Sequence, residues 1–197
     1  LVGSEMCIRD RYALCDCTGY RLDGTDTEPN MYVGIIINRS LADTTDSVTG
    51  LGDVHALVNA IGEMRHVPHE AGFIAIKVDD IAEVNARFGF DAGDRVLAES
   101  AACLMDCSRG KGRLFRSTGP MFVALFDELG PEAIDEIASD IERFLGTPVL
   151  IGSLEYQPPI RVATLHLDGV DRQPVSILNE LKALLGKAVQ VPGTKLD

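Results

Sequence analysis

The stretch Arg116-Ser117-Thr118-Gly119-Pro120-Met121-Phe122 lies between the apolar segments 114–115 and 123–126. Gly and Pro in sequence favour a turn, and apolar residues on both sides favour short strands. We therefore predict strands over 113–117 and 121–126, joined by a turn at residues 118–120. Pro120 lacks a backbone N–H and fixes φ, which restricts the conformation of this turn.

Helical and strand patterns extend in both directions from this hairpin. Asp53 is a suitable N-cap for a helix within 46–64, and Leu57, Ala60, Ile61 and Met64 recur on one face of it. The remaining patterns predict helices over 81–87, 92–107, 131–145 and 175–187, strands over 31–37, 73–78 and 160–167, and a final strand within 190–197 that the chain end cuts short. This order predicts an α+β fold, with helices around an antiparallel or mixed sheet.

Composition excludes several classes of function. The chain has 197 residues, 46% of them apolar, and a net charge of -12, so a phosphate backbone would repel it and nucleic acid is not an expected partner. No apolar run approaches the length of a membrane-spanning helix, and no secretory signal is recognisable. The five cysteines fit neither a disulfide framework nor a zinc site, so we expect a cytoplasmic protein with reduced thiols.

Three segments in this order resemble the GGDEF (diguanylate cyclase) family. The stretch 46–51 (DSVTGL) resembles the family's D-x-L-T-G-L motif, and 85–94 (NARFGFDAGD) resembles N-D-x-x-G-H-x-x-G-D. The stretch 116–122 stands where the family has R-x-G-G-D-E-F. The resemblance implies a central, mostly antiparallel five-stranded palm-like sheet flanked by helices. We assign residues 42–197 to this domain.

The residues before this domain have a different character. The stretch 34–46 resembles the last strand and linker of a PAS sensor, so we interpret residues 12–41 as the C-terminal remnant of a PAS-like domain. Residues 1–11 match no structural period and resemble a translated sequencing adapter. We expect them to be non-native or disordered.

The resemblance also implies that catalysis is lost. Active members join two GTP molecules into cyclic di-GMP, one GTP per domain in a dimer, and their magnesium ions need oxygen ligands. The family takes these ligands from the first Asp of a D-x-D motif and from the acidic residues of the signature loop. Those positions hold Lys77, Pro120 and Met121 here. The degenerate loop Thr118-Gly119-Pro120-Met121-Phe122 therefore predicts no catalytic residue and no magnesium site.

Some nucleotide-binding positions are retained. By resemblance, Asn85 and Asp94 match residues that contact guanine, and we add Lys77 and Gly119 as candidate nucleotide-binding residues. Lys77 can contact phosphate, or it can form a salt bridge with Asp79 or Asp94. Asn85 and Asp94 can instead be helix caps. Arg109 matches the Arg of the family's R-x-x-D product site, but Gly112 replaces the Asp.

These observations predict a catalytically inactive GGDEF-like regulatory module of cyclic di-GMP signalling. GTP is a candidate ligand without turnover, and no other cofactor is expected. The expected partners are another protein, a linked domain such as an EAL-type phosphodiesterase, or a second copy of the chain. Two alternatives stay open, a weakly active cyclase that relies on Asp79, Glu83 and Asp94, and a purely structural protein-interaction domain.

Overall fold

The computed structural model describes residues 6–8, 11–13, 15–22, 31–38, 44–64, 71–108, 110–145, 148–167 and 173–194. The chain divides into two units, Leu1–Asp43 and Thr44–Asp197. In the first unit, β1 (Met6–Ile8) pairs antiparallel with β2 (Arg11–Ala13), and β3 (Cys15–Leu22) pairs antiparallel with β4 (Met31–Asn38). β4 matches the strand expected over 31–37. The sensor remnant at 12–41 and the non-native character of residues 1–11 stay predictions.

The second unit is built around one antiparallel sheet of five strands. Its spatial order is β11-β10-β5-β7-β6, and every neighbouring pair is antiparallel. The strands are β5 (Ala71–Val78), β6 (Arg113–Arg116), β7 (Met121–Phe126), β10 (Ile160–Leu167) and β11 (Gln190–Val191). The α+β fold with a five-stranded antiparallel sheet is therefore confirmed.

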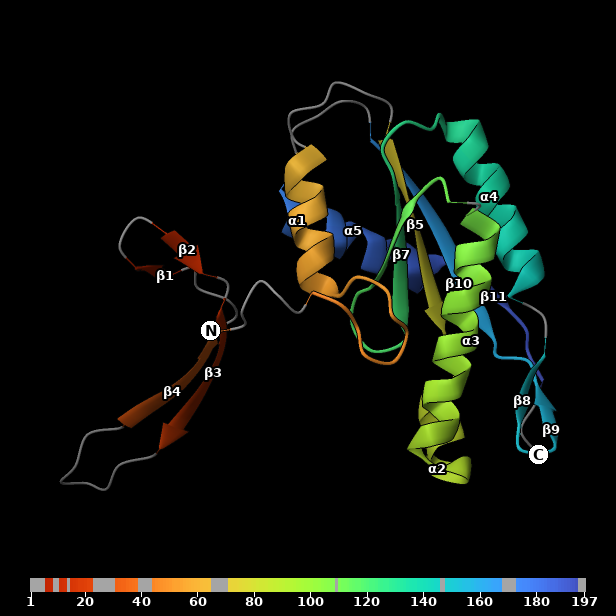
Figure 1. Cartoon of the computed structure of the whole chain (residues 1–197), viewed down its shortest axis with the longest axis horizontal. Helices are drawn as coiled ribbons and strands as arrows, with labels where there is room; N and C mark the ends of the chain where they lie inside the picture. Colours follow the sequence, from red (N-terminus) through yellow and green to blue (C-terminus); the bar gives the residue numbers. More distant parts are fainter. Residues whose placement is uncertain are drawn as a thin grey trace. The chain divides into compact units, whose positions relative to one another are not determined.

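Helices cover both faces of this sheet (Figure 1). α1 (Val54–Met64) and α5 (Pro174–Lys187) cover one face, and α3 (Phe90–Ser108) and α4 (Pro131–Phe144) cover the other, with α2 (Ile81–Phe88) packed on α3. The central strand β5 alternates between the two cores. Phe73 and Ala75 pack with α1 and α5, whereas Ile74 and Ile76 pack with α3 and α4. Because side chains alternate along a strand, the side chain of Lys77 lies on the same face of the sheet as those of Phe73 and Ala75.

One hairpin of the second unit was not predicted from the sequence. A hairpin of β8 (Val149–Ile151) and β9 (Leu154–Tyr156) follows α4, and its turn contains Gly152 with a φ of 63°. Each strand has only three residues, and Leu150 and Leu154 are exposed although they are apolar. Strands this short give no readable alternation, so the hairpin is found only from its backbone pairing.

Candidate functional site

Four side chains from four strands form one row at the end of the sheet. Lys77 on β5 lies opposite Arg161 on β10 and Met121 on β7, and Gln190 on β11 lies opposite Arg161. Directly opposite residues in antiparallel strands project from the same face of the sheet. Met121 packs in the core that contains α1 and α5. The row therefore points to the α1 and α5 face.

Asp79 joins three members of this row. Lys77 Nζ lies 2.6 Å from Asp79 Oδ1, while Arg161 Nε and Gln190 Nε2 each donate to Asp79 Oδ2 at 2.8 Å. Asp79 is 5% exposed. Burial raises the pKa of Asp79, but hydrogen bonds from Lys77, Arg161 and Gln190 outweigh it and hold the pKa below its ordinary value of 3.8. Of the two salt bridges considered for Lys77, the structure shows the one with Asp79.

The signature hairpin is held to the start of the domain by Arg116. Arg116 Nε donates to the carbonyl of Gly119 at 3.0 Å, and its NH1 group donates to Asp46 Oδ1 at 3.0 Å. Thr49 also donates to Asp46 from its backbone N–H and its hydroxyl. Burial raises the pKa of Asp46, and these hydrogen bonds from Thr49 and Arg116 outweigh it, so the pKa is lowered. Two of the three sequence motifs thus meet in one structural contact.

The turn of this hairpin also shapes the end of the sheet. Gly119 has a φ of 58°, a left-handed conformation that favours glycine. The next carbonyl, that of Pro120, accepts a hydrogen bond from the backbone N–H of Val78 at 3.1 Å. Pro120 has no N–H, so it cannot return a second hydrogen bond to the carbonyl of Val78, and the pairing of β5 with β7 ends here.

A hollow of about 320 Å³ opens between this turn and α5. It is lined by three cations and by uncharged side chains, among them Lys77, Arg161, Lys182, Thr118, Met121 and Leu185. Lys182 and Leu185 belong to α5. Lys77, Thr118, Pro120 and Met121 were predicted site residues, whereas Arg161, Gln190 and Lys182 were missed.

The two candidate guanine contacts do not line this hollow. Asn85 is the fifth residue of α2, and its Oδ1 is buried and has no hydrogen-bond partner among the described residues. Its side chain lies against Gly93 so closely that a Cβ at Gly93 would clash with it. Asp94 is exposed and is the fifth residue of α3. The alternative that these side chains cap helices is wrong, because both lie inside helices, and Asp80 precedes α2 without a side-chain cap. Arg109 lies outside the described residues.

A family model, that of the diguanylate cyclase GGDEF domain, matches residues 43–168. The chain belongs to the GGDEF domain family. In sequence, this GGDEF domain is 29% identical over 113 residues to the cyclic di-GMP phosphodiesterase PdeR of Escherichia coli (strain K12). That match covers 56% of the chain but only 17% of PdeR, so the chain spans a small part of that relative.

Solved structures show the same fold. The GGDEF domain of FimX from Pseudomonas aeruginosa matches with a TM-score of 0.70 and 16% identity, over 75% of this chain and 94% of the other. Diguanylate cyclase SiaD in complex with its activator SiaC, from Pseudomonas aeruginosa, matches with a TM-score of 0.68 and 20% identity, over 74% of this chain and 58% of SiaD. Among the described helices of this GGDEF domain, none is both long enough and apolar enough to cross a bilayer.

The donor set at the end of the sheet does not fit magnesium. Magnesium prefers hard oxygen ligands, whereas the row offers an ammonium from Lys77 and a thioether from Met121. The nearby carboxylate of Asp79 already accepts hydrogen bonds from three side chains. Within the described ranges, no group of three or more His, Cys, Asp or Glu side chains is arranged to hold a metal ion.

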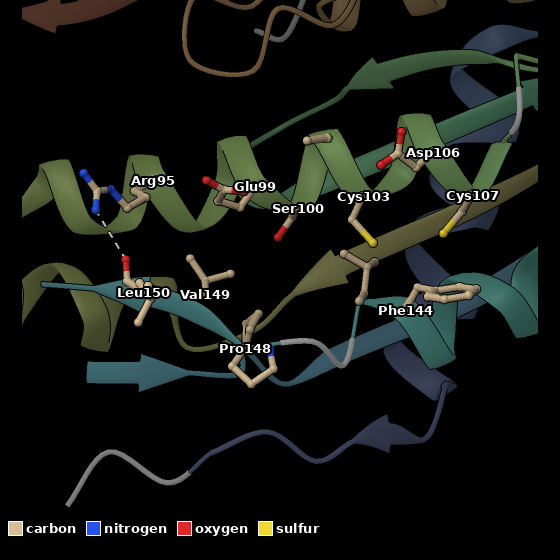
Figure 2. A pocket seen from close by; sticks show the side chains of 13 residues that line it. Arg95, Glu99, Ser100, Cys103, Asp106, Cys107, Phe144, Pro148, Val149 and Leu150 are labelled. Carbon is tan, nitrogen blue, oxygen red and sulfur yellow. Dashed lines mark hydrogen bonds between the residues drawn. The ribbon is translucent and has the colours of Figure 1, made fainter. Parts of the chain in front are cut away.

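A second, larger hollow of about 820 Å³ lies along α3 of the GGDEF domain (Figure 2). Cys103 and Cys107 of α3 point toward the segment that carries Phe144 and Pro148, and neither thiol is in a disulfide. Arg95 closes one end by donating to the carbonyl of Leu150 at 3.4 Å. The walls are mostly apolar, with acidic side chains of Glu99 and Asp106 on α3.

We expect Cys103 to resist alkylation in the folded protein. Burial, followed by the neighbouring Cys107 and Asp106, raises the pKa of the Cys103 thiol to about 12. The reactive species is the thiolate, so at pH 8 roughly one molecule in 10,000 carries it. Iodoacetamide treatment and peptide-mass mapping should find Cys103 unmodified at pH 8 and modified once the chain is unfolded in urea. Equal labelling of folded and unfolded protein would contradict this expectation.

Proposed function

We propose that this domain is a non-catalytic regulatory module of cyclic di-GMP signalling, which binds a nucleotide without turning it over. One observation carries the proposal. At the positions where the family resemblance implies metal-binding carboxylates, Lys77 is ion-paired with Asp79 and Met121 lies directly opposite Lys77. Phosphoryl transfer of this kind depends on metal ions that neutralise developing charge. A site that offers a cation and a thioether instead would not assemble that metal centre.

The alternative of a weakly active cyclase finds less support. Of its three candidate acids, Asp79 is engaged by Lys77, Arg161 and Gln190, and Glu83 pairs with Arg87 at 3.0 Å on the exposed side of α2. Asp94 is exposed on α3. These acids do not form a group that could hold a metal.

Turnover is the decisive measurement. We expect no cyclic di-GMP above a protein-free blank when the purified chain is incubated with GTP and magnesium and the mixture is separated by chromatography. An active diguanylate cyclase run in parallel shows that the assay detects product. Any product that depends on the chain, and that is lost after boiling it, would refute the proposal and favour the weakly active cyclase.

For the regulatory role, we propose a cytoplasmic module that acts on a protein partner or on a linked domain, such as an EAL-type phosphodiesterase. Two comparisons support this. The chain resembles a small part of a longer cyclic di-GMP phosphodiesterase, and a protein of the same fold has been solved in complex with its activator. A second copy of the chain is a further candidate partner. If GTP gives neither heat nor a thermal shift, a purely structural interaction domain replaces the nucleotide-binding version.

Asn85 and Asp94 stay the proposed guanine contacts. The buried Oδ1 atom of Asn85 lacks a partner among the described residues, which leaves it able to accept a hydrogen bond from a ligand. Asp94 is exposed and therefore accessible to a base edge.

A further inference from the structure

The smaller hollow concentrates positive charge in a protein that is strongly acidic. The whole chain has a net charge of -12, yet three of the side chains around this hollow are Lys77, Arg161 and Lys182, and none of its lining residues is acidic. Like charges repel, so three cations around one hollow need a nearby anion to offset them. Asp79 supplies only one negative charge, because it is a single carboxylate shared by Lys77 and Arg161. Among the described residues, Asp79 is the one carboxylate that pairs with these cations, so two positive charges are left over.

The three cationic side chains also have N–H donors that are not used in contacts with the described residues. The side chains of Lys77 and Arg161 are 45% and 31% exposed, so both reach solvent while they contact Asp79. Arg161 uses Nε toward Asp79, and its terminal nitrogens have no partner among the described residues. Lys182 is exposed on α5 and forms no ion pair with any described carboxylate. An ammonium group has three N–H donors and a guanidinium group has five, so several N–H donors around the hollow are available to a ligand.

The uncharged residues around the hollow and its volume limit the size and chemistry of the ligand that it can hold. Thr118 adds a hydroxyl, while Met121 and Leu185 give an apolar wall that excludes water from one side. About 320 Å³ is at the lower end of the range for small-molecule sites, so the hollow can hold a chain of two or three phosphates but not a whole nucleotide. Cations with several N–H donors are the usual partners of phosphate oxygens.

We propose that this hollow binds the polyphosphate group of a small molecule without a divalent cation, with Lys77, Arg161 and Lys182 supplying the positive charge. The inference rests on the proposed function, since it names the chemistry by which a non-catalytic domain would hold a nucleotide. Arg161 and Lys182 come from β10 and α5, so the site is assembled only in the folded domain. Magnesium neutralises polyphosphate in solution and competes with these cations, so it weakens the binding.

Calorimetric titration of the purified chain with sodium tripolyphosphate, in EDTA and low salt, tests this directly. We expect one binding event, weakened by added magnesium and by added salt. Lys182→Gln should weaken it about tenfold, because a charge-assisted contact to phosphate is lost. Lys187→Gln is the matched control, since Lys187 is exposed at the end of the same helix and does not line the hollow. Both positions are exposed, so neither change should affect folding.

Three results would overturn the inference: no heat in EDTA, binding that requires magnesium, or an equal loss of affinity in Lys187→Gln and Lys182→Gln.

Parallel titrations with GTP and ATP identify the source of the phosphates. Affinity for GTP above that for ATP and tripolyphosphate means that the base adds contacts, and equal affinities mean that the phosphates alone carry recognition. The turnover assay is independent of these results. If the chain forms no cyclic di-GMP and also does not bind tripolyphosphate, this inference is wrong, whereas the proposed lack of catalysis still holds.

Discussion

Asp79→Leu is expected to lower the free energy of unfolding by about 2–3 kcal/mol, because it leaves two cations and an amide without their shared acceptor. Asp79 is 5% exposed and receives contacts from Lys77, Arg161 and Gln190 at 2.6–2.8 Å. Removing one partner of a buried pair costs about 3–5 kcal/mol when the other stays buried. The expected loss is smaller, since Lys77 and Arg161 are partly exposed and water can replace the carboxylate. Urea unfolding at pH 7 measures it.

The matched control for this change is Asp80→Asn. Asp80 follows Asp79 directly but is exposed, and its φ of 62° is a conformation that Asn adopts readily. We expect this control to stay within about 0.5 kcal/mol of the wild type. If Asp79→Leu were as stable as Asp80→Asn, the row of Lys77, Arg161 and Gln190 would not depend on its carboxylate.

The same carboxylate sets a pH dependence. Its folded-state pKa lies below 3.8, so the unfolded chain binds the proton more readily than the folded protein does. The stabilisation is therefore fully present above the unfolded pKa and is lost as the pH falls through the folded pKa. For Asp79→Asn, the difference in stability from wild type should accordingly shrink as the pH is lowered from 6 toward 3. Asp46 has the same sign of shift and remains in both proteins.

Local periodicity was sufficient for most of the fold. Apolar residues at helical spacing placed the helix expected over 131–145, which the structure shows as α4 (Pro131–Phe144), and the strand expected over 160–167 coincides with β10. The cap of α1 was also predictable, since Asp53 Oδ1 accepts from the backbone N–H groups of His55 and Ala56. The five-stranded, mostly antiparallel sheet was expected from the family resemblance, but the order of its strands was not predicted, because local pattern does not specify which strands are neighbours.

The site was predictable only in part, because sheet register assembles it. Lys77 and Asp79 are two residues apart and lie on the same side of a strand, so their salt bridge could be anticipated. Arg161 and Gln190 are 82 and 111 residues from Asp79, and nothing local connects them. One signal was available, since Arg161 is a charged residue in the otherwise largely apolar strand β10. For Asn85 and Asp94 only the capping alternative is wrong, since both lie inside helices here, and their guanine contacts stay a prediction.

Two carboxylates introduced at positions 77 and 121 are expected to create a magnesium site at the end of the sheet. Residues 77 and 121 lie directly opposite each other on β5 and β7, so their Cβ atoms are about 4.5–5.5 Å apart. In Lys77→Asp/Met121→Glu, two like charges would repel in EDTA and destabilise the domain, while a shared magnesium ion would offset that repulsion. At a magnesium concentration of about 100 times the dissociation constant, the expected stabilisation is about 2.7 kcal/mol. Urea unfolding with magnesium and with EDTA measures this difference.

The amide variant Lys77→Asn/Met121→Gln is the control, because it has nearly the same shape and no added negative charge. We expect magnesium to leave both this control and the wild type unchanged within about 0.5 kcal/mol, since amides and a thioether bind magnesium poorly. Equal stabilisation of all three proteins would mean that magnesium binds elsewhere on this acidic chain. A response of the acidic variant alone would show that carboxylates at positions 77 and 121 are sufficient for magnesium binding, because only these carboxylates distinguish it from the amide control.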